Sequence, residues 1–350
     1  MIPFDKVKRV NKSYGYKFGE NSSDKSKVNI NLWGKNVSLY GNVNFSIYSA
    51  QKCNADCTFC VEELRPASRG VQLANQKRIL QSDSAYFEAL YESLEAVRLA
   101  KPTISITGGE PSKDRRLEEI LSITSKFEAP RITITTNASG LLDKVNNKMV
   151  LDTIINGKCN HINISRAHYS DIWNNRLMRY SEGPTIKELK YIVAKSKEAG
   201  VRVRLSCVLI DGAIDTVDKI IKYLKFSEYI GVDNVIFRQL MKIDKQKFAS
   251  NYVVLFTEAK RTNLDSILHE IEKNKDMNFQ SQIVGYYYYV EVWKYKNIDV
   301  VFEEADLAQL EKSKQEYPNL IHELVFHPNG KLCSTWQPWD GILGPNIQVN

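Results

Sequence analysis

The sequence predicts an α/β protein built around a parallel β-sheet. Short β-type runs alternate with helical runs from about residue 41 to 245, and this alternation is typical of parallel strands joined by right-handed helical crossovers. After residue 245 helices flank an aromatic, β-rich run instead. We therefore expect an N-terminal extension over 1–40, a core over 41–245 and a C-terminal α+β region over 246–350 that caps the core.

Composition and charge indicate a globular protein without a membrane span. The chain has 350 residues, of which 43% are hydrophobic and 25% charged, as in ordinary globular proteins. It contains no run of about 18 apolar residues and no apolar segment behind the basic N-terminus, so we expect no membrane span and no signal peptide. We predict a cytoplasmic protein with reduced thiols. The net charge of +7 favours an anionic partner, and no nucleic-acid-binding motif is present.

The first elements lead into a cluster of cysteines. Turn residues at 34–36 predict a hairpin at the end of the extension, and the alternating apolar residues of 43–49 predict a strand. Cys53, Cys57 and Cys60 follow this strand in the pattern C-x3-C-x2-C. Three such thiolates can hold three irons of a 4Fe–4S cluster and leave the fourth iron open for a ligand. The triad alone also permits zinc with a distant fourth ligand.

A second motif stands behind the next strand. Helical spacing over 83–99, with Ser82 or Ser84 as N-cap, precedes the run ISITGGEPS at 104–112, and a helix is expected over about 114–127. The paired glycines let the backbone approach a ligand closely, and the carboxylate of Glu110 can accept hydrogen bonds from an ammonium group. Taken alone, the motif is equally consistent with a plain strand-to-helix turn.

The two motifs together resemble the joint signature of the radical S-adenosylmethionine (SAM) enzymes. They lie about fifty residues apart, which is one βαβ step. The resemblance implies a single 4Fe–4S cluster and SAM as cofactors, with the methionine part of SAM on the open iron, and an external electron donor of the flavodoxin or ferredoxin type. It also implies reductive cleavage of SAM to a 5′-deoxyadenosyl radical that abstracts hydrogen from the substrate.

The remaining elements continue the same rhythm. Strands are expected over 131–137, 161–168, 201–210 and 234–240, with helices near 148–156 and over 185–199 and 214–228. Six such units resemble the partial (β/α)6, TIM-like barrel of the radical SAM family. In the C-terminal cap we expect helices over about 255–274 and 304–315, a β-rich run over 286–302 and a hairpin around Asn329 and Gly330.

The resemblance assigns site residues position by position. It implies that Cys53, Cys57 and Cys60 ligate the cluster, and that Gly108, Gly109 and Glu110 meet the methionine amino group of SAM. The other SAM contacts that it implies are Phe59, Leu209 and Ile210 for the adenine, Ser165 for a ribose hydroxyl, Asn137 for polar contacts and Arg166 for the SAM carboxylate. For Asn137 and Ser165 a local turn role is the alternative.

The substrate is less well defined by the sequence. The TGGEP form, the TTN strand end and the tail with Cys333 resemble the molybdenum-cofactor GTP cyclase type, but those enzymes carry three C-terminal cysteines for a second cluster. Here Cys333 stands alone, which predicts either a buried residue or a hydrogen-atom donor to the substrate radical. Cys159 and Cys207 are also expected to be buried. Arg238 ends the last core strand, where it could bind a phosphate or carboxylate.

Three interpretations of the function remain open at this point. The leading one is a radical SAM enzyme that acts on a small molecule, such as a nucleotide or a natural-product intermediate, with an anionic substrate favoured by the net charge. The second is a peptide-modifying radical SAM enzyme, which the lack of further cluster cysteines disfavours. The third is a zinc-binding structural protein, which the Gly-Gly-Glu-Pro motif disfavours.

Overall fold

One sheet of twelve strands organises the part of the chain that the computed structural model describes, namely residues 27–41, 43–49, 53–61, 82–180, 182–243, 251–284 and 287–345. In spatial order the strands are β11 (Met277–Val284), β12 (Tyr288–Tyr295), β13 (Ile298–Ala305), β10 (Asn234–Gln239), β9 (Arg202–Leu209), β8 (His161–Ser165), β5 (Ile132–Thr136), β4 (Thr103–Thr107), β3 (Asn44–Tyr48), β15 (Leu324–Phe326), β16 (Leu332–Cys333) and β17 (Ile342–Gly344).

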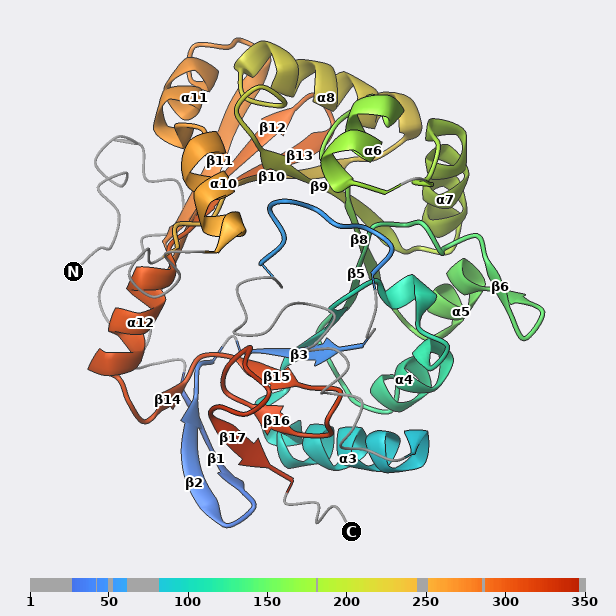
Figure 1. The fold of residues 1–350 in the computed structure, drawn as a ribbon, viewed down its shortest axis with the longest axis vertical. Coiled ribbons are helices and arrows are strands. Elements are labelled where there is room, and N and C mark those ends of the chain that lie inside the picture. The colour runs from blue at the N-terminus through green and yellow to red at the C-terminus, as the bar shows by residue number, and fades with distance from the viewer. Residues whose placement is uncertain are drawn as a thin grey trace.

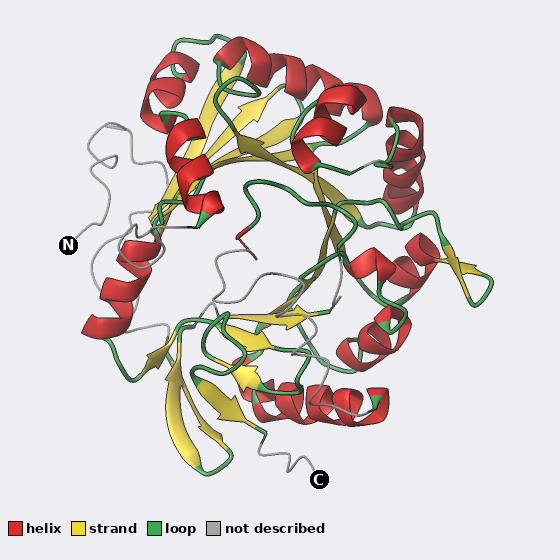
Figure 2. Cartoon of the chain, in the orientation of Figure 1, coloured by secondary structure: helices red, strands yellow, loops and turns green. Residues whose placement is uncertain are grey.

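The six central strands confirm the predicted partial barrel. Strands β3, β4, β5, β8, β9 and β10 are parallel and neighbour one another in chain order. They curve as an incomplete ring with the helices outside it (Figures 1 and 2). Among the described residues the outer strands β11 and β17 do not pair with each other, so the barrel is not closed there.

Helices cover the outer face of this sheet (Figure 2). They are α3 (Asp83–Ala96), α4 (Leu117–Thr124), α5 (Val150–Asn156), α7 (Ile186–Glu198), α8 (Val217–Ile230) and α11 (Leu264–Ile271). The described residues also form α6 (Asp171–Met178) and α10 (Tyr252–Lys260), which pack near the cysteine loop and the strand ends, and α12 (Leu307–Glu316). The expected cap of α3 is Ser82, whose hydroxyl accepts from the Ala85 backbone N–H. In the described part of the chain, none of the helices has the length and apolarity to cross a membrane.

The C-terminal region extends the sheet at both edges. Strand β13 lies parallel to β10 and continues into the antiparallel strands β12 and β11, while β15 lies parallel to β3 and continues into β16 and β17. An edge strand offers unpaired backbone N–H and C=O groups, and these strands satisfy them. The region therefore contributes to the sheet itself, which the sequence pattern did not indicate. Its role as a cap over the substrate stays a prediction.

The N-terminal hairpin is confirmed. Strand β1 (Val28–Leu32) pairs with β2 (Lys35–Leu39) in antiparallel register, and β14 (Leu320–Ile321) joins β2 in parallel. The hairpin thus contacts the chain just before β15. The first 26 residues of the expected extension lie outside the described residues.

Side chains of the central strands separate cleanly by face. Residues such as Ile104 and Ile106 of β4 or Val203 and Leu205 of β9 are buried in the core between sheet and helices. Because successive side chains of a strand point to opposite faces, the intervening residues face the inside of the ring. They are mostly polar: Asn44, Ser46, Thr103, Ser105, Thr107, Thr133, Thr135, His161, Asn163, Ser165, Arg204, Ser206 and Arg238.

We expect the outer core to carry most of the stability. Phe237 is fully buried, and its ring lies 5.4 Å from the rings of both Phe302 and Tyr223. Phe237→Ala should lower the free energy of unfolding by about 3–5 kcal/mol, since it leaves a cavity. Leu99, which is 83% exposed, is the matched control, and Leu99→Ala should change it by less than about 0.5 kcal/mol. Urea unfolding measures the free energy of unfolding of both variants. Equal decreases in the two variants would contradict the proposal that the outer core carries most of the stability.

Candidate active site

The motif residues gather at the carboxyl ends of adjacent parallel strands. The loop with the three cysteines follows β3, the Gly-Gly-Glu-Pro turn follows β4 and Asn137 follows β5. In Figure 1 the described part of the cysteine loop lies inside the ring of strands. This is the edge at which parallel α/β proteins assemble their active sites.

Glu110 is the most completely bonded of these residues. Its carboxylate is buried, with 1% of the residue exposed. Oε1 accepts hydrogen bonds from the Ser112 backbone N–H (3.0 Å), from Ser112 Oγ (2.5 Å) and from Thr136 Oγ1. Oε2 accepts one from the Asn137 backbone N–H (2.6 Å). The side chain therefore joins the turn after β4 to the end of β5.

The environment of Glu110 suits a cationic ligand. Burial raises the pKa of this carboxyl, and the hydrogen bonds from Ser112, Thr136 and Asn137 oppose the rise. A carboxylate offers about four lone pairs, and the described contacts leave capacity on Oε2, which accepts one bond there. A cation beside Oε2 would favour the ionised form further.

Two constraints require glycine at position 108: a positive φ and the close approach of the Tyr48 ring. Its φ is +84°, in the region that favours glycine. A Cβ at this position would lie only 2.6 Å from the ring of Tyr48, the last residue of β3. The Tyr48 ring in turn stacks on the imidazole of His327, with 6.4 Å between the ring centroids. The turn is thus pressed against β3, and β3 against the C-terminal hairpin.

Asn137 connects the end of β5 to the cysteine loop. Its Nδ2 donates to Asn54 Oδ1 (2.9 Å) and lies 3.9 Å from Cys53 Sγ. Its Oδ1 accepts from the Ser139 backbone N–H (3.0 Å), and Ser139 Oγ donates to Asn54 Oδ1 (3.1 Å). The local turn role that the sequence kept open is therefore present, and a contact with a cofactor stays a prediction.

The three motif cysteines belong to one cluster of side chains, together with Ala55, Ala167, Leu177, Met178, Tyr180 and Phe59. Cys57 is buried, and its Sγ lies 3.4 Å from the Met178 carbonyl oxygen. Within the described ranges no three His, Cys, Asp or Glu side chains form a site for a single metal ion. A cubane instead places each thiolate on a different iron, so its ligands stand further apart. Three soft thiol donors on one loop fit such a cluster.

An apolar wall stands beside these cysteines. Phe59 packs both against the cysteine cluster and against a second cluster that contains Ile210, Ala213 and Leu240. The structure thus brings together Phe59 and Ile210. Leu209 lies instead in the core between sheet and helices.

Ser165 ends β8, and Arg166 follows it. Ser165 lies beside Ser206 of β9 on the inner face. Arg166 is 1% exposed, and its Nη2 lies 2.5 Å from Asp171 Oδ1 at the start of α6. Its guanidinium also contacts the carbonyl oxygens of Tyr169 and Pro184, each at 3.4 Å. This arrangement holds α6 in place, so a carboxylate-binding role for Arg166 stays a prediction.

The remaining candidates lie away from the cysteine loop. Arg238 faces the inside of the ring and forms an ion pair with Glu303 of β13 at 3.3 Å. Cys333 is fully buried in β16, and burial raises its pKa to about 12, so the thiol stays protonated. Cys159 and Cys207 are buried as well, which confirms that expectation.

Sequence reasoning missed a clamp behind the Gly-Gly-Glu-Pro turn. Arg116 Nη2 donates to the carbonyl oxygen of Ser49 (2.7 Å) and pairs with Asp114 Oδ2 (3.0 Å). The Ser49 hydroxyl donates to the same Asp114 oxygen (3.0 Å), and the guanidinium lies 4.3 Å from the centroid of the Tyr86 ring. The clamp fixes the chain just before the cysteine loop to the turn. The sequence indicates only a helix over about 114–127 at these positions, and no contact with Ser49.

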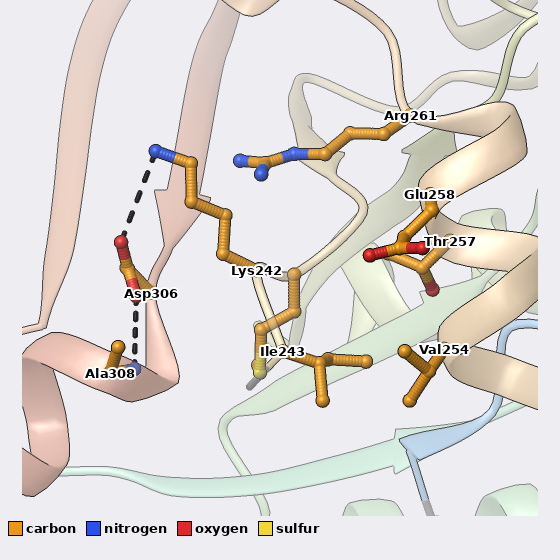
Figure 3. Close-up of a pocket in the computed structure, with 9 residues that line it drawn as sticks. Lys242, Ile243, Val254, Thr257, Glu258, Arg261, Asp306 and Ala308 are labelled. Carbon is orange, nitrogen blue, oxygen red and sulfur yellow. Dashed lines mark hydrogen bonds and ion pairs between the residues drawn. The ribbon is translucent and has the colours of Figure 1, made fainter. Parts of the chain in front are cut away.

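A cavity of about 350 Å³ opens where the chain leaves β10 (Figure 3). One end is charged: Lys242 Nζ and Arg261 Nη2 lie 3.2 and 3.1 Å from Glu304 Oε1. The other end is apolar, with Ile243 and Val254. Its full lining is Met241, Lys242, Ile243, Val254, Thr257, Glu258, Arg261, Asp306 and Ala308. No sequence signal indicated it.

Comparison with known proteins identifies relatives of the core. A family model described as the radical SAM superfamily matches residues 47–226. A GTP 3′,8-cyclase of Aquifex aeolicus (strain VF5) is 26% identical over 183 residues, 52% of this chain and 51% of that protein. A GTP 3′,8-cyclase 2 of Mycobacterium tuberculosis (strain ATCC 25618 / H37Rv) is 28% identical over 203 residues. The match covers 53% of this chain and 48% of that protein. The chain spans about half the length of these curated relatives.

A solved structure supports the fold. The crystal structure of Streptococcus suis SuiB bound to S-adenosylmethionine has a TM-score of 0.52, covering 84% of this chain and 60% of SuiB at 14% identity. SuiB has also been solved bound to its precursor peptide SuiA, with a TM-score of 0.51. At this identity the likeness concerns the fold alone.

The geometry of Gly108 gives a prediction with an internal control. Gly212 has almost the same φ, +87°, but a Cβ there meets no atom within 4 Å. Gly212→Ala should therefore cost only the left-handed backbone conformation, about 1–2 kcal/mol. Gly108→Ala should cost about 1–3 kcal/mol more, because the Tyr48 ring must move. Equal losses in denaturant unfolding would contradict the close packing of the turn on β3.

Proposed function

Because the chain belongs to the radical SAM superfamily, we propose that it cleaves SAM reductively on a single 4Fe–4S cluster and acts on a small-molecule substrate. The observation that carries the proposal is the meeting of the C-x3-C-x2-C loop with the Gly-Gly-Glu-Pro turn, through Asn137, at adjacent strand ends. When bound, the cluster and SAM supply the 5′-deoxyadenosyl radical that abstracts hydrogen from the substrate. An external donor of the flavodoxin or ferredoxin type supplies the electron.

The cysteines would hold the cluster. Cys53 and Cys60 are half-buried and Cys57 is buried, so the loop can shield iron and sulfide from water on one side. The thiols must lose their protons to bind iron, which couples cluster binding to pH. No second set of clustered cysteines occurs in the sequence, where the other three are isolated, and this supports a single cluster.

The neighbouring residues would hold SAM. The backbone of Gly108 and Gly109 and the carboxylate of Glu110 suit the methionine ammonium group, because they place an acceptor and a negative charge beside it. Phe59 and Ile210 provide the apolar surface that an adenine ring needs. Ser165 and Asn137 are the polar side chains at the same strand ends, which suits the ribose and the methionine part.

The substrate is proposed to be a nucleotide or a related small anion. The curated relatives are named for a reaction of GTP, and the chain is basic overall. The inward-facing Arg238 would bind a phosphate or carboxylate only in competition with its ion pair to Glu303. The buried Cys333 would act as a hydrogen-atom donor only if substrate reached β16, so we assign it a structural role in the first instance.

Peptide modification is the second candidate. It is favoured by the likeness in fold to SuiB, which has been solved bound to a precursor peptide. The third interpretation, a zinc-binding structural protein, does not fit the family match.

We expect cluster and SAM chemistry to depend on the motif thiols. Protein prepared without oxygen should contain about four irons per chain and form 5′-deoxyadenosine with dithionite and SAM. Both should be lost in Cys57→Ala, which removes one of the three ligands. Cys159→Ala removes a buried thiol outside the site and should leave both unchanged.

Iron content also tests the single-cluster proposal. About eight irons per chain would indicate a second cluster and contradict it. Zinc-loaded protein that forms no 5′-deoxyadenosine would overturn the proposed activity.

The carboxylate of Glu110 gives a separate prediction for SAM affinity. Glu110→Gln removes the negative charge and should weaken SAM binding by about tenfold or more, since a hydrogen bond to a charged group is lost. Thr136→Val removes one donor to Glu110 but keeps the charge, and is the control for disturbance of the turn. Anaerobic calorimetric titration measures the SAM affinity of both variants. Equally weakened SAM binding in Glu110→Gln and Thr136→Val would assign Glu110 a purely structural role.

A further inference from the structure

The inner wall of the ring contains polar groups that the proposed SAM site does not use. Closed eight-stranded α/β barrels fill their interior with bulky branched side chains. Here the inward residues of β5, β8 and β9 include Thr133, Thr135, Asn163 and Arg204. The buried hydrogen-bonding groups of such a wall need partners in the protein, in water or in a ligand.

Arg204 is the charged centre of this wall. Asn163 and Arg204 stand directly opposite each other in the parallel register of β8 and β9. The Nε of Arg204 donates to the Asn234 side-chain oxygen. Among the described residues no carboxylate forms an ion pair with this guanidinium. The direct hydrogen-bond partner of this half-buried positive charge is therefore a neutral amide.

Two acidic residues of strand β13 form ion pairs with other basic side chains. Glu303 pairs with Arg238 at 3.3 Å. Asp299 pairs with Arg202 at 2.5 Å and with Lys294 at 2.8 Å. The local charge balance around Arg204 is accordingly positive. Burial, followed by the charges of Arg238, Arg131 and Arg202, lowers the pKa of Arg204 to about 10, and the charge of Glu303 only partly opposes this shift.

Two buried polar atoms of the neighbouring strand β8 have no hydrogen-bond partner among the described residues. They are Nε2 of His161 and Oδ1 of Asn163, and the two residues are only 5% and 7% exposed. Burial, followed by the charges of Arg204, Arg131 and Arg202, lowers the pKa of His161 to about 3, so the imidazole is neutral. A neutral imidazole can donate from Nε2. Asn163 Nδ2 lies 3.4 Å from Thr135 Oγ1, so the atom of Asn163 that lacks a partner is the acceptor Oδ1, which suits a hydroxyl group.

We propose that Arg204 and His161 bind an oxyanion of the substrate, a phosphate or a carboxylate, inside the ring of strands, and that Asn163 Oδ1 accepts a hydrogen bond from a hydroxyl of the same substrate. The proposal rests on the proposed function and names the substrate class. A guanidinium binds such groups through two parallel N–H donors, and the anion restores the charge balance of the wall.

The position of this site fits the proposed chemistry. Ser165 lies two residues beyond Asn163 on β8, and so about 7 Å nearer the carboxyl edge. The described cysteine loop lies inside the same ring of strands (Figure 1). An anion held at Arg204 thus leaves the remainder of a small substrate directed toward that edge.

Direct binding measurements on the anaerobically reconstituted holoenzyme test the proposal. Phosphate and succinate are titrated separately by calorimetry at constant ionic strength, and the tighter of the two identifies the oxyanion. Arg204→Gln should weaken this binding at least tenfold. Arg98→Gln makes the same change at an exposed residue on the outer surface and should leave binding unchanged. Wild-type protein that binds neither anion, or Arg204→Gln protein that binds as tightly as wild type, would overturn the proposal and leave water as the partner of the wall.

A second variant guards against a folding defect in Arg204→Gln. Asn163→Asp places a carboxylate of the same shape opposite Arg204. The variant should have a higher melting temperature and bind no anion, because the new carboxylate forms an ion pair with the Arg204 guanidinium. Undiminished anion binding by Asn163→Asp would also contradict the proposal.

The two proposals can fail independently. SAM cleavage without substrate should persist in Arg204→Gln, because Arg204 lies on the β9 wall and not on the motif loops. If wild-type protein binds the anion but never forms 5′-deoxyadenosine, the proposed function fails while the anion site remains. If it forms 5′-deoxyadenosine but binds no anion, only the anion site fails.

Discussion

The buried carboxylate of Glu110 is the contact on which the motif region depends. A charge removed from water must be hydrogen-bonded or it destabilises the fold, and here donors come from the turn after β4 and from the end of β5. The same strand end then reaches the cysteine loop through Asn137 and Asn54. One desolvated group therefore fixes three segments that lie far apart in the sequence. The clamp of Asp114 and Arg116 on Ser49 secures the loop from its other side.

The outer face of the sheet contributes most of the stability, and the inner face carries the polar residues that we propose to bind substrate. The outer face carries the continuous apolar core against the helices, which fixes strand positions regardless of what the inner face contains. Parallel sheets covered on both faces usually have continuous apolar strands. The polar inner face here is a departure from that pattern, and it costs hydrogen-bonding free energy wherever groups such as His161 Nε2 stay without partners. Such a cost is common at functional sites, where local stability is given up for binding.

Local patterns in the sequence identified most of the core but not its long-range partners. Alternation and turn residues located the six central strands, the cap at Ser82 and the hairpin at Asn329 and Gly330 within a few residues, because each depends on neighbouring side chains. The same patterns could not show that β13 pairs with β10 or β15 with β3, since strand pairing is set by contacts across the whole chain. Helix α6, which has a polar sequence, gave no periodic signal and was missed.

The same distinction applies to the site. Cysteine spacing and the Gly-Gly-Glu-Pro motif are local signals, so Cys57 and Glu110 could be assigned from sequence. The binding wall depends on register: only the pairing of β8 with β9 shows that Asn163 faces Arg204. One signal was nevertheless present, because runs such as ITITT, HINIS and RVRLSC alternate strictly, which is unusual for parallel strands covered on both faces.

The cavity beside α10 is a less suitable place for the reacting part of the substrate. Arg261 contacts Gln239 and Glu304, and successive side chains of a strand point to opposite faces. Gln239 and Glu304 therefore point away from the face that carries Arg238 and Glu303. Phe256 of α10 packs against the cluster of Ile210 and Leu240, while Val254 and Thr257 line the cavity. Helix α10 thus stands between the cavity and the apolar wall beside Phe59. Under the proposed function, the apolar wall and the inner face of the sheet lie on the same side of α10, which supports the polar wall around Arg204 as the place where substrate is held.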